Sequence, residues 1–175
     1  EKTPEQIGSV IGGAAVVFTL LSVCLFAAMV FFARPISVLM QAPAEAVTLT
    51  TSYVRICGSG IFFIVAYNLL SAIFRGLGDS KSPLLFVLVA CIVNIVGDLV
   101  LVAGLHMDAA GAAFATVFAQ AVSVVFAVVI LFKKQLPFHI GKRDLGFNSQ
   151  CSKFLSIGLP LALQEFLTQV SFLAL

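Results

Sequence analysis

Residues 81–104 read KSPLLFVLVACIVNIVGDLVLVAG, and this stretch decides the fold class. It is apolar over a length that crosses a bilayer, because a helix rises about 1.5 Å per residue and about 20 residues span the hydrocarbon. Asn94 and Asp98 lie inside it four positions apart, so a helix places them on one face. An ionisable side chain at that depth costs at least about 2.5 kcal/mol. We therefore expect both side chains to face a bundle interior rather than lipid. A structural Asp that bonds to a neighbouring helix is the alternative to a functional one, and the functional reading is favoured because intramembrane ionisable groups mark ion or substrate paths.

The composition excludes an ordinary soluble domain. Of the 175 residues, 61% are hydrophobic and 10% are charged, whereas about 25% of the residues of a soluble domain are charged. The cysteines form no CxxC or other metal-ligand spacing, and the sequence contains no Walker loop, GxGxxG or HExxH motif. We predict an all-α, polytopic membrane protein that is not an enzyme, has no catalytic residues, metal site or organic cofactor, and does not bind nucleic acid.

Four apolar stretches predict four transmembrane helices, at about residues 9–33, 46–74, 82–105 and 109–132. Residues 133–150, KKQLPFHIGKRDLGFNSQ, form a polar and basic linker, and a further apolar run begins within residues 151–175. Because residue 1 is not Met and the chain stops within an apolar run, we expect a piece of a longer protein.

Two local patterns predict how these helices turn and pack. The loop RGLGDSKSP, residues 75–83, has two glycines for a compact turn, and we expect Ser82 to cap the helix that follows. Gly111, Ala115 and Ala119 recur every four residues, which is typical of a small-residue face that lets another helix approach closely.

A depth argument compares the third and fourth spans. The chain reverses near Met107, so residues equidistant from it should lie at similar depth. Asp98 and Thr116 are each nine positions away, and Asn94 and Gln120 are each thirteen away. Polar side chains should therefore meet across the two helices. A hydroxyl bonded only to its own helix backbone is an equally weighted reading for Thr116.

Basic residues alternate between the expected loops and so predict the orientation. One set of loops carries nearly all of them: Lys2, Arg75, Lys81, Lys133, Lys134, Lys142, Arg143 and Lys153. The positive-inside rule places that set in the cytoplasm. The linker at 133–150 is then cytoplasmic, and Tyr53, Asp98 and Thr116 lie in the outer halves of their helices.

Four motifs in this order resemble the multidrug and toxic compound extrusion (MATE) transporter family. They are RGLGDSKSP (75–83), VNIVGDLVLV (93–102), DAAGAAFATVFAQ (108–120) and IGLPLALQEF (157–166), and TTSYVRI around Tyr53 also fits. Members of the family have twelve transmembrane helices in two six-helix lobes. The resemblance implies that this chain is helices three to six of the amino-terminal lobe, the inter-lobe loop and the start of helix seven, the first of the carboxy-terminal lobe.

The resemblance also implies site residues. One branch of the family uses a Tyr, an Asn, an Asp and a Thr for proton coupling, and these match Tyr53, Asn94, Asp98 and Thr116 here. That branch uses a further Asp on helix one, which this chain does not contain. Gln120 joins the candidates by depth. Glu165 is either an intramembrane carboxylate or a residue at the rim of a cavity, and the family match gives it no role.

The function that follows is a secondary antiporter in the cell membrane, the plasma membrane in a bacterium. It would export amphipathic or cationic drugs or metabolites in exchange for protons or sodium. Its partners would be a small organic substrate, membrane lipids and the remaining helices of the full-length protein. The alternatives are a lipid-linked oligosaccharide flippase of the same superfamily and a non-transporting membrane assembly subunit. Arg55 is the only basic residue inside a span, which disfavours a phosphate-binding flippase cavity. The substrate, the coupling ion and the oligomeric state stay open.

Overall fold

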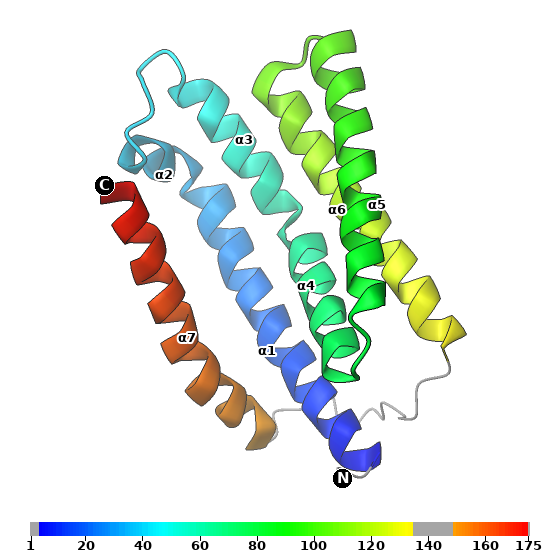
Figure 1. Ribbon diagram of the computed structural model, residues 1–175. Helices are drawn as coiled ribbons and strands as arrows, with labels where there is room; N and C mark the ends of the chain where they lie inside the picture. Colours follow the sequence, from blue (N-terminus) through cyan, green and yellow to red (C-terminus); the bar gives the residue numbers. More distant parts are fainter. Residues whose placement is uncertain (1–3, 135–148, 175) are drawn as a thin grey trace. The chain divides into compact units, whose positions relative to one another are not determined.

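The computed structural model describes residues 4–134 and 149–174, and within them every regular element is a helix. Figure 1 shows their order along the chain. The elements are α1 (Pro4–Phe31), α2 (Ala33–Leu39), α3 (Val47–Ser59), α4 (Ile61–Gly76), α5 (Lys81–Asp98), the π-helix η1 (Leu99–Gly104), α6 (Asp108–Lys133) and α7 (Ser149–Ala174). The predicted all-α fold class is confirmed. Most of the expected linker at 133–150 lies outside the described residues.

The chain divides into two units, which we describe separately. One unit is Phe18–Leu136 and holds the second half of α1 together with α2 to α6. The other unit is Glu1–Val17 with Pro137–Leu175 and holds the start of α1 and the whole of α7. Every site residue that the sequence predicts, except Glu165, falls in the first unit.

Three helical stretches of the described residues are long and apolar enough to cross a membrane: Gly8–Phe31, Lys81–Gly104 and Asp108–Lys133. A fourth span is formed if α3 and α4 are taken together, although they meet at an angle of 51°. The sequence predicted one continuous helix over 46–74, and the structure divides it at Gly60. Gly60 lies so close to Val117 of α6 that a side chain there would collide with it.

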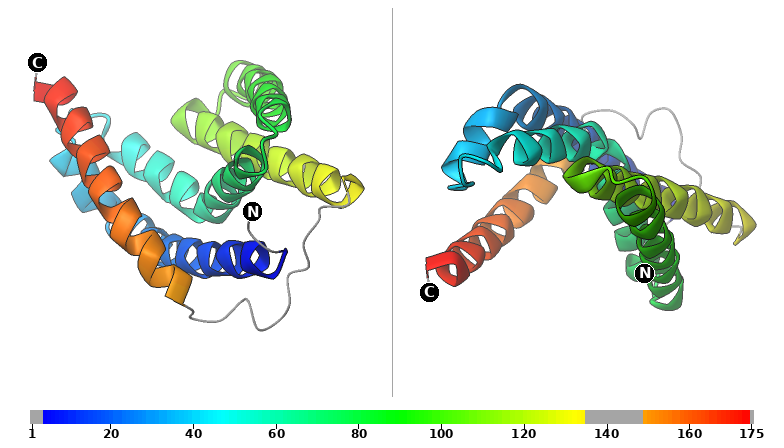
Figure 2. Two further views of the ribbon diagram at one scale, coloured as in Figure 1. Left: turned by 60° about the horizontal axis from the view of Figure 1, so that its bottom comes forward. Right: turned by 90° about the horizontal axis from the view of Figure 1, so that it is seen from above.

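The first unit is organised around α6, which packs against α3, α4 and α5; Figure 2 shows these helices from two further directions. The small-residue face predicted on α6 is confirmed, because Gly111, Ala115 and Ala119 are all buried. A β-carbon on Gly97 of α5 would lie 2.9 Å from the β-carbon of Ala115. Glycine at position 97 therefore lets the backbones of α5 and α6 approach closely, as small residues do between membrane helices.

The loop between α4 and α5 is fixed by Asp79. Its Oδ1 accepts hydrogen bonds from the backbone amides of Lys81 and Ser82, each at 3.1 Å. The expectation that Ser82 caps α5 is therefore wrong: Asp79 caps the helix, and the Ser82 hydroxyl donates to Asp79 Oδ2 at 2.6 Å. Aspartate is as good a cap as serine because its carboxylate also complements the positive end of the helix dipole. Gly78, with φ of 82°, makes the turn as the sequence predicts.

The same loop is joined to the end of α6 by an ion pair. The ammonium of Lys134 contacts Asp79 Oδ2, lies 3.1 Å from the Ser82 hydroxyl and sits 5.9 Å from the centre of the Phe74 ring. Beneath this pair, Phe74 and Phe86 are buried and meet edge to face with ring centres 5.2 Å apart. These polar and aromatic contacts thus hold α4, α5 and α6 together at the end where the α4–α5 loop lies.

Candidate functional site

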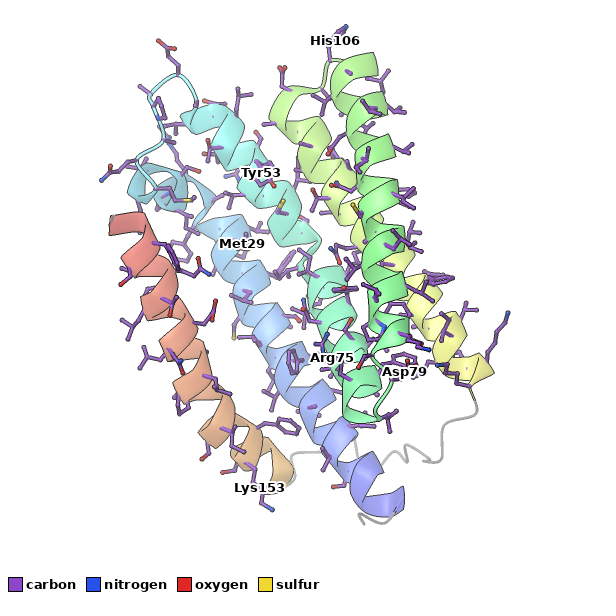
Figure 3. The ribbon with its side chains drawn as sticks, viewed as in Figure 1. Met29, Tyr53, Arg75, Asp79, His106 and Lys153 are labelled. Carbon is purple, nitrogen blue, oxygen red and sulfur yellow. The ribbon has the colours of Figure 1, made fainter. Side chains whose placement is uncertain are left out.

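Three helices bring the predicted polar residues together in the first unit. Tyr53 lies on α3, Asn94 and Asp98 lie on α5, and Thr116 and Gln120 lie on α6. Figure 3 marks Tyr53 on its helix, well separated along the bundle from Asp79 in the loop between α4 and α5. The site is therefore made by elements that are distant in sequence and joined through α6.

Asn94 and Thr116 make the direct polar contact between α5 and α6. Asn94 Nδ2 lies 3.4 Å from Thr116 Oγ1, and the Thr116 hydroxyl donates to the carbonyl of Ala112 at 2.9 Å. Thr116 therefore makes both of the expected contacts. Its hydroxyl hydrogen bonds to the backbone of its own helix, and a lone pair of its oxygen faces Asn94. An amide-to-hydroxyl contact of 3.4 Å is at the long end for a hydrogen bond.

This side-chain pairing differs from the depth argument, which matched Thr116 with Asp98, although the close approach of Gly97 to Ala115 shows that the backbones are shifted by less than one helical turn. The π-helix η1 contributes to this shift. Its i→i+5 hydrogen bonds put more residues into each turn than an α-helix does, so α5 and η1 use more residues than α6 to cover the same depth. The amide of Leu105 accordingly bonds to the carbonyl of Val100, five residues earlier.

Asp98 is the last residue of α5 and directly precedes η1. Its Oδ1 is buried and has no hydrogen-bond partner among the described residues. A buried carboxylate oxygen without a partner is costly, because its hydration is lost and nothing replaces it. Asp98 thus has an unsatisfied carboxylate oxygen within the site, and it is the only acidic residue on α5.

Tyr53 connects α3 to this group. Its side chain is close enough to Cys57 and Thr116 for their polar atoms to interact, and close enough to Asp98 to feel its charge. Cys57, one helical turn further along α3, is buried. The structure therefore places Tyr53, Asp98 and Thr116 within one electrostatic neighbourhood and adds Cys57, which the sequence did not single out.

A hollow of about 230 Å³ opens between α4, α5 and α6 beside the Asn94–Thr116 contact. Its lining residues come from all three helices: Tyr67, Val87, Ala90, Cys91, Asn94, Thr116, Ala119 and Gln120. The sequence pattern did not single out Tyr67 or Cys91 as site residues. Cys91 lies three positions before Asn94, so helical spacing alone could have placed it on the same face.

Glu165 lies outside the unit that carries this arrangement. It lies on α7 in the other unit, its side chain is exposed, and its Oε1 accepts a hydrogen bond from Gln169 Nε2 at 3.1 Å. Both roles considered for Glu165, an intramembrane carboxylate and a residue at the rim of a cavity, therefore stay predictions.

Comparison with known proteins places this geometry in a family. The MatE family model matches residues 1–100. The probable multidrug resistance protein YpnP of Bacillus subtilis is 31% identical over 161 residues, which cover 91% of this chain and 36% of that protein. The multidrug export protein MepA of Staphylococcus haemolyticus is 25% identical over 142 residues, covering 80% of this chain and 31% of that protein.

A solved structure is also similar to this chain. A crystal structure of a MATE protein in complex with MaD3S superposes with a TM-score of 0.80 at 25% identity, covering 95% of this chain and 43% of that one. The chain spans about a third of the length of the two curated relatives.

Proposed function

The chain belongs to the MatE family, a family of multi-pass membrane transporters and not of enzymes, and from that premise we propose that it forms part of a secondary antiporter that exports organic molecules in exchange for protons or sodium. The relatives named as multidrug resistance and multidrug export proteins support export of drugs. In this proposal the chain supplies helices three to six of the amino-terminal lobe and the start of helix seven, and the remaining helices complete the path.

The observation that carries the proposal is the state of Asp98. It is an acidic side chain inside a membrane-spanning helix, one of its carboxylate oxygens is buried without a partner among the described residues, and Tyr53 lies within range of its charge. Such groups in membrane helices mark ion and substrate pathways. A carboxylate that is not held by a permanent partner is free to take a proton or a cation and to release it.

The exchange follows from the change of charge at Asp98. When ionised, the carboxylate attracts a cationic substrate. Binding of a proton, or of sodium, cancels that attraction, so substrate and coupling ion favour different states of one site. Asn94 and Thr116 tie α5 to α6 beside Asp98, and they transmit a shift of either helix to the other. Tyr53 brings α3 into the same neighbourhood.

The lining of the hollow favours this antiporter over the flippase. A cavity that binds a lipid-linked phosphate needs basic side chains, whereas the eight residues that line the hollow are all uncharged. Asp98 lies one helical turn beyond Asn94 on α5, and in its ionised state it repels an anion.

The test is the Asp98→Asn variant of the full-length transporter in proteoliposomes. Asparagine preserves size and hydrogen bonding but cannot carry the exchanged charge, so ion-driven export of a fluorescent cationic dye should fall at least about 100-fold while insertion and folding persist. Asp108→Asn is the matched control, because Asp108 is exposed at the start of α6, about two helical turns before Thr116. It should export at the wild-type rate.

Separate proton and sodium gradients identify the coupling ion. Export that follows the pH gradient supports proton exchange, and export that follows the sodium gradient supports a carboxylate that binds sodium. Asp98→Asn protein that exports at the wild-type rate under both gradients would overturn the proposal.

A further inference from the structure

The hollow beside Asn94 lies near the middle of its helices. Ala90 and Cys91 are midway along Lys81–Gly104, and Ala119 and Gln120 are midway along Asp108–Lys133. Secondary transporters bind their substrates near the bilayer midplane. The depth of the hollow is therefore that of a substrate site, and its lining should reveal what kind of chemical group it accepts.

Some of the polar groups that line the hollow have hydrogen-bond partners among the described residues, and one does not. The Thr116 hydroxyl donates to Ala112, and Asn94 Nδ2 points to Thr116. Gln120 Oε1, by contrast, is buried and has no hydrogen-bond partner among the described residues. An acceptor left in that state is costly, because its hydration is lost and nothing replaces it. The unmet requirement of the hollow is thus a hydrogen-bond donor.

Gln120 can meet that requirement with a guest molecule. Its side chain lines the hollow, and the last torsion of a glutamine side chain is broad, so a modest rotation turns the amide oxygen toward the hollow at little cost. Tyr67 lines the hollow from α4, and an aromatic ring attracts a cation whether or not the cation carries N–H groups.

We propose that Gln120 determines specificity in the hollow by accepting a hydrogen bond from an N–H group of the substrate, so that protonated amines bind better than quaternary cations of the same shape. The inference rests on the proposed function, because it takes the hollow as the place where the exported molecule binds. Tyr67 holds either kind of cation, and Gln120 distinguishes between them.

The test uses two probes that share one aromatic group and differ in the N–H groups: naphthylmethylammonium and naphthylmethyltrimethylammonium. Their dissociation constants are measured by calorimetry on the purified full-length transporter and on its Gln120→Leu variant, which keeps the approximate volume of the side chain but loses the acceptor. The variant should bind the ammonium probe about tenfold more weakly. It should bind the trimethylammonium probe within about twofold of the wild type, because that probe has no hydrogen bond to lose.

Two further variants make the result specific. Gln120→Glu keeps an acceptor oxygen at the same place, so it should retain the preference for the ammonium probe. Val87→Ala changes an apolar wall of the same hollow, so it should shift both dissociation constants by a similar factor. Thermal unfolding of each variant shows whether the protein is folded at the temperature of the titration.

The outcomes separate this inference from the proposed function. Equal weakening of both probes by Gln120→Leu, or no change in either, would overturn the role of Gln120 while leaving an Asp98-dependent exporter intact. If wild-type protein that exports a dye binds neither probe, the hollow is not a cation site and the inference is wrong. Loss of the probe preference in Gln120→Leu, together with its retention in Gln120→Glu, is the expected result.

Discussion

Asn94 Nδ2 on α5 lies 3.4 Å from Thr116 Oγ1 on α6, and this contact ties the two helices that carry the candidate site. We predict that it contributes a small but measurable coupling free energy. Polar contacts between membrane helices contribute about 0.6 kcal/mol on average. A double-mutant cycle with Asn94→Leu and Thr116→Val, read from the unfolding free energy of the full-length protein, should return a coupling of about that size.

Thr116→Ser is the control for this cycle, because it keeps the hydroxyl and loses only a methyl group. It should retain the coupling with Asn94. A coupling energy of zero would mean that the Thr116 hydroxyl serves only the carbonyl of Ala112, which is the backbone reading of this residue.

Gly60 separates α3 from α4 at the point where the two helices bend by 51°. A β-carbon there would lie 2.5 Å from Cγ1 and 3.0 Å from Cβ of Val117. The backbone angles of Gly60, φ −88° and ψ 2°, are open to alanine, so crowding rather than conformation decides the cost. We predict that Gly60→Ala destabilises the protein by about 1–3 kcal/mol, as overpacking does.

Two measurements test the cause. Val117→Ala added to Gly60→Ala should recover much of the lost stability, because it removes the methyl groups that collide. Gly76→Ala is the control, since nothing lies within 4 Å of a β-carbon at Gly76; it should leave the unfolding free energy unchanged or raise it by up to about 1 kcal/mol. Gly60→Ala protein as stable as the wild type would show that the α3–α4 bend is not held by Val117.

The sequence predicted the apolar spans well because hydrophobic length is a local property, and a stretch such as residues 81–104 needs no partner to be recognised. The break at Gly60 could not be predicted in the same way. A glycine within a helical pattern is tolerated in many helices, and the residue that makes it necessary, Val117, is far away in the sequence.

The candidate site was likewise predictable only in part. Asn94, Asp98 and Thr116 are polar residues in apolar surroundings, so composition alone singles them out. Their register was not predictable, because the π-helix at Leu99–Gly104 contains only apolar residues and glycine and resembles an ordinary helix end. Tyr67 and Cys91 look like core residues in the sequence, and only the packing of α4 against α5 and α6 brings them to the hollow.

The last prediction concerns Asp79, which lies outside the spans in the loop before α5. The Lys134 ammonium, helped by the Ser82 hydroxyl and backbone amide, holds the pKa of the Asp79 carboxyl well below its usual range. Because the pKa of Asp79 is lower in the folded than in the unfolded protein, the ionised carboxylate stabilises the fold at any pH above its unfolded-state pKa of about 3.9. This stabilisation is lost as the pH falls from there through the folded-state pKa. Asp79→Asn should therefore lower the thermal midpoint by the same amount at pH 8 and pH 5.

The difference from the wild type should narrow only below about pH 4, where protonation begins to remove the wild-type advantage. Lys134→Gln should cost less than Asp79→Asn, because the Asp79 carboxylate that accepts from the amides of Lys81 and Ser82 would keep its negative charge at the positive end of the α5 dipole. Lys133→Gln, one residue earlier and exposed, removes the same charge without touching Asp79 and should leave the midpoint unchanged. Two outcomes would contradict the role of the Asp79–Lys134 pair. One is a midpoint difference between Asp79→Asn and wild type that already changes between pH 8 and pH 5. The other is an equal fall in midpoint for Lys134→Gln and Lys133→Gln, which would mean that net charge rather than this ion pair holds the loop to α6.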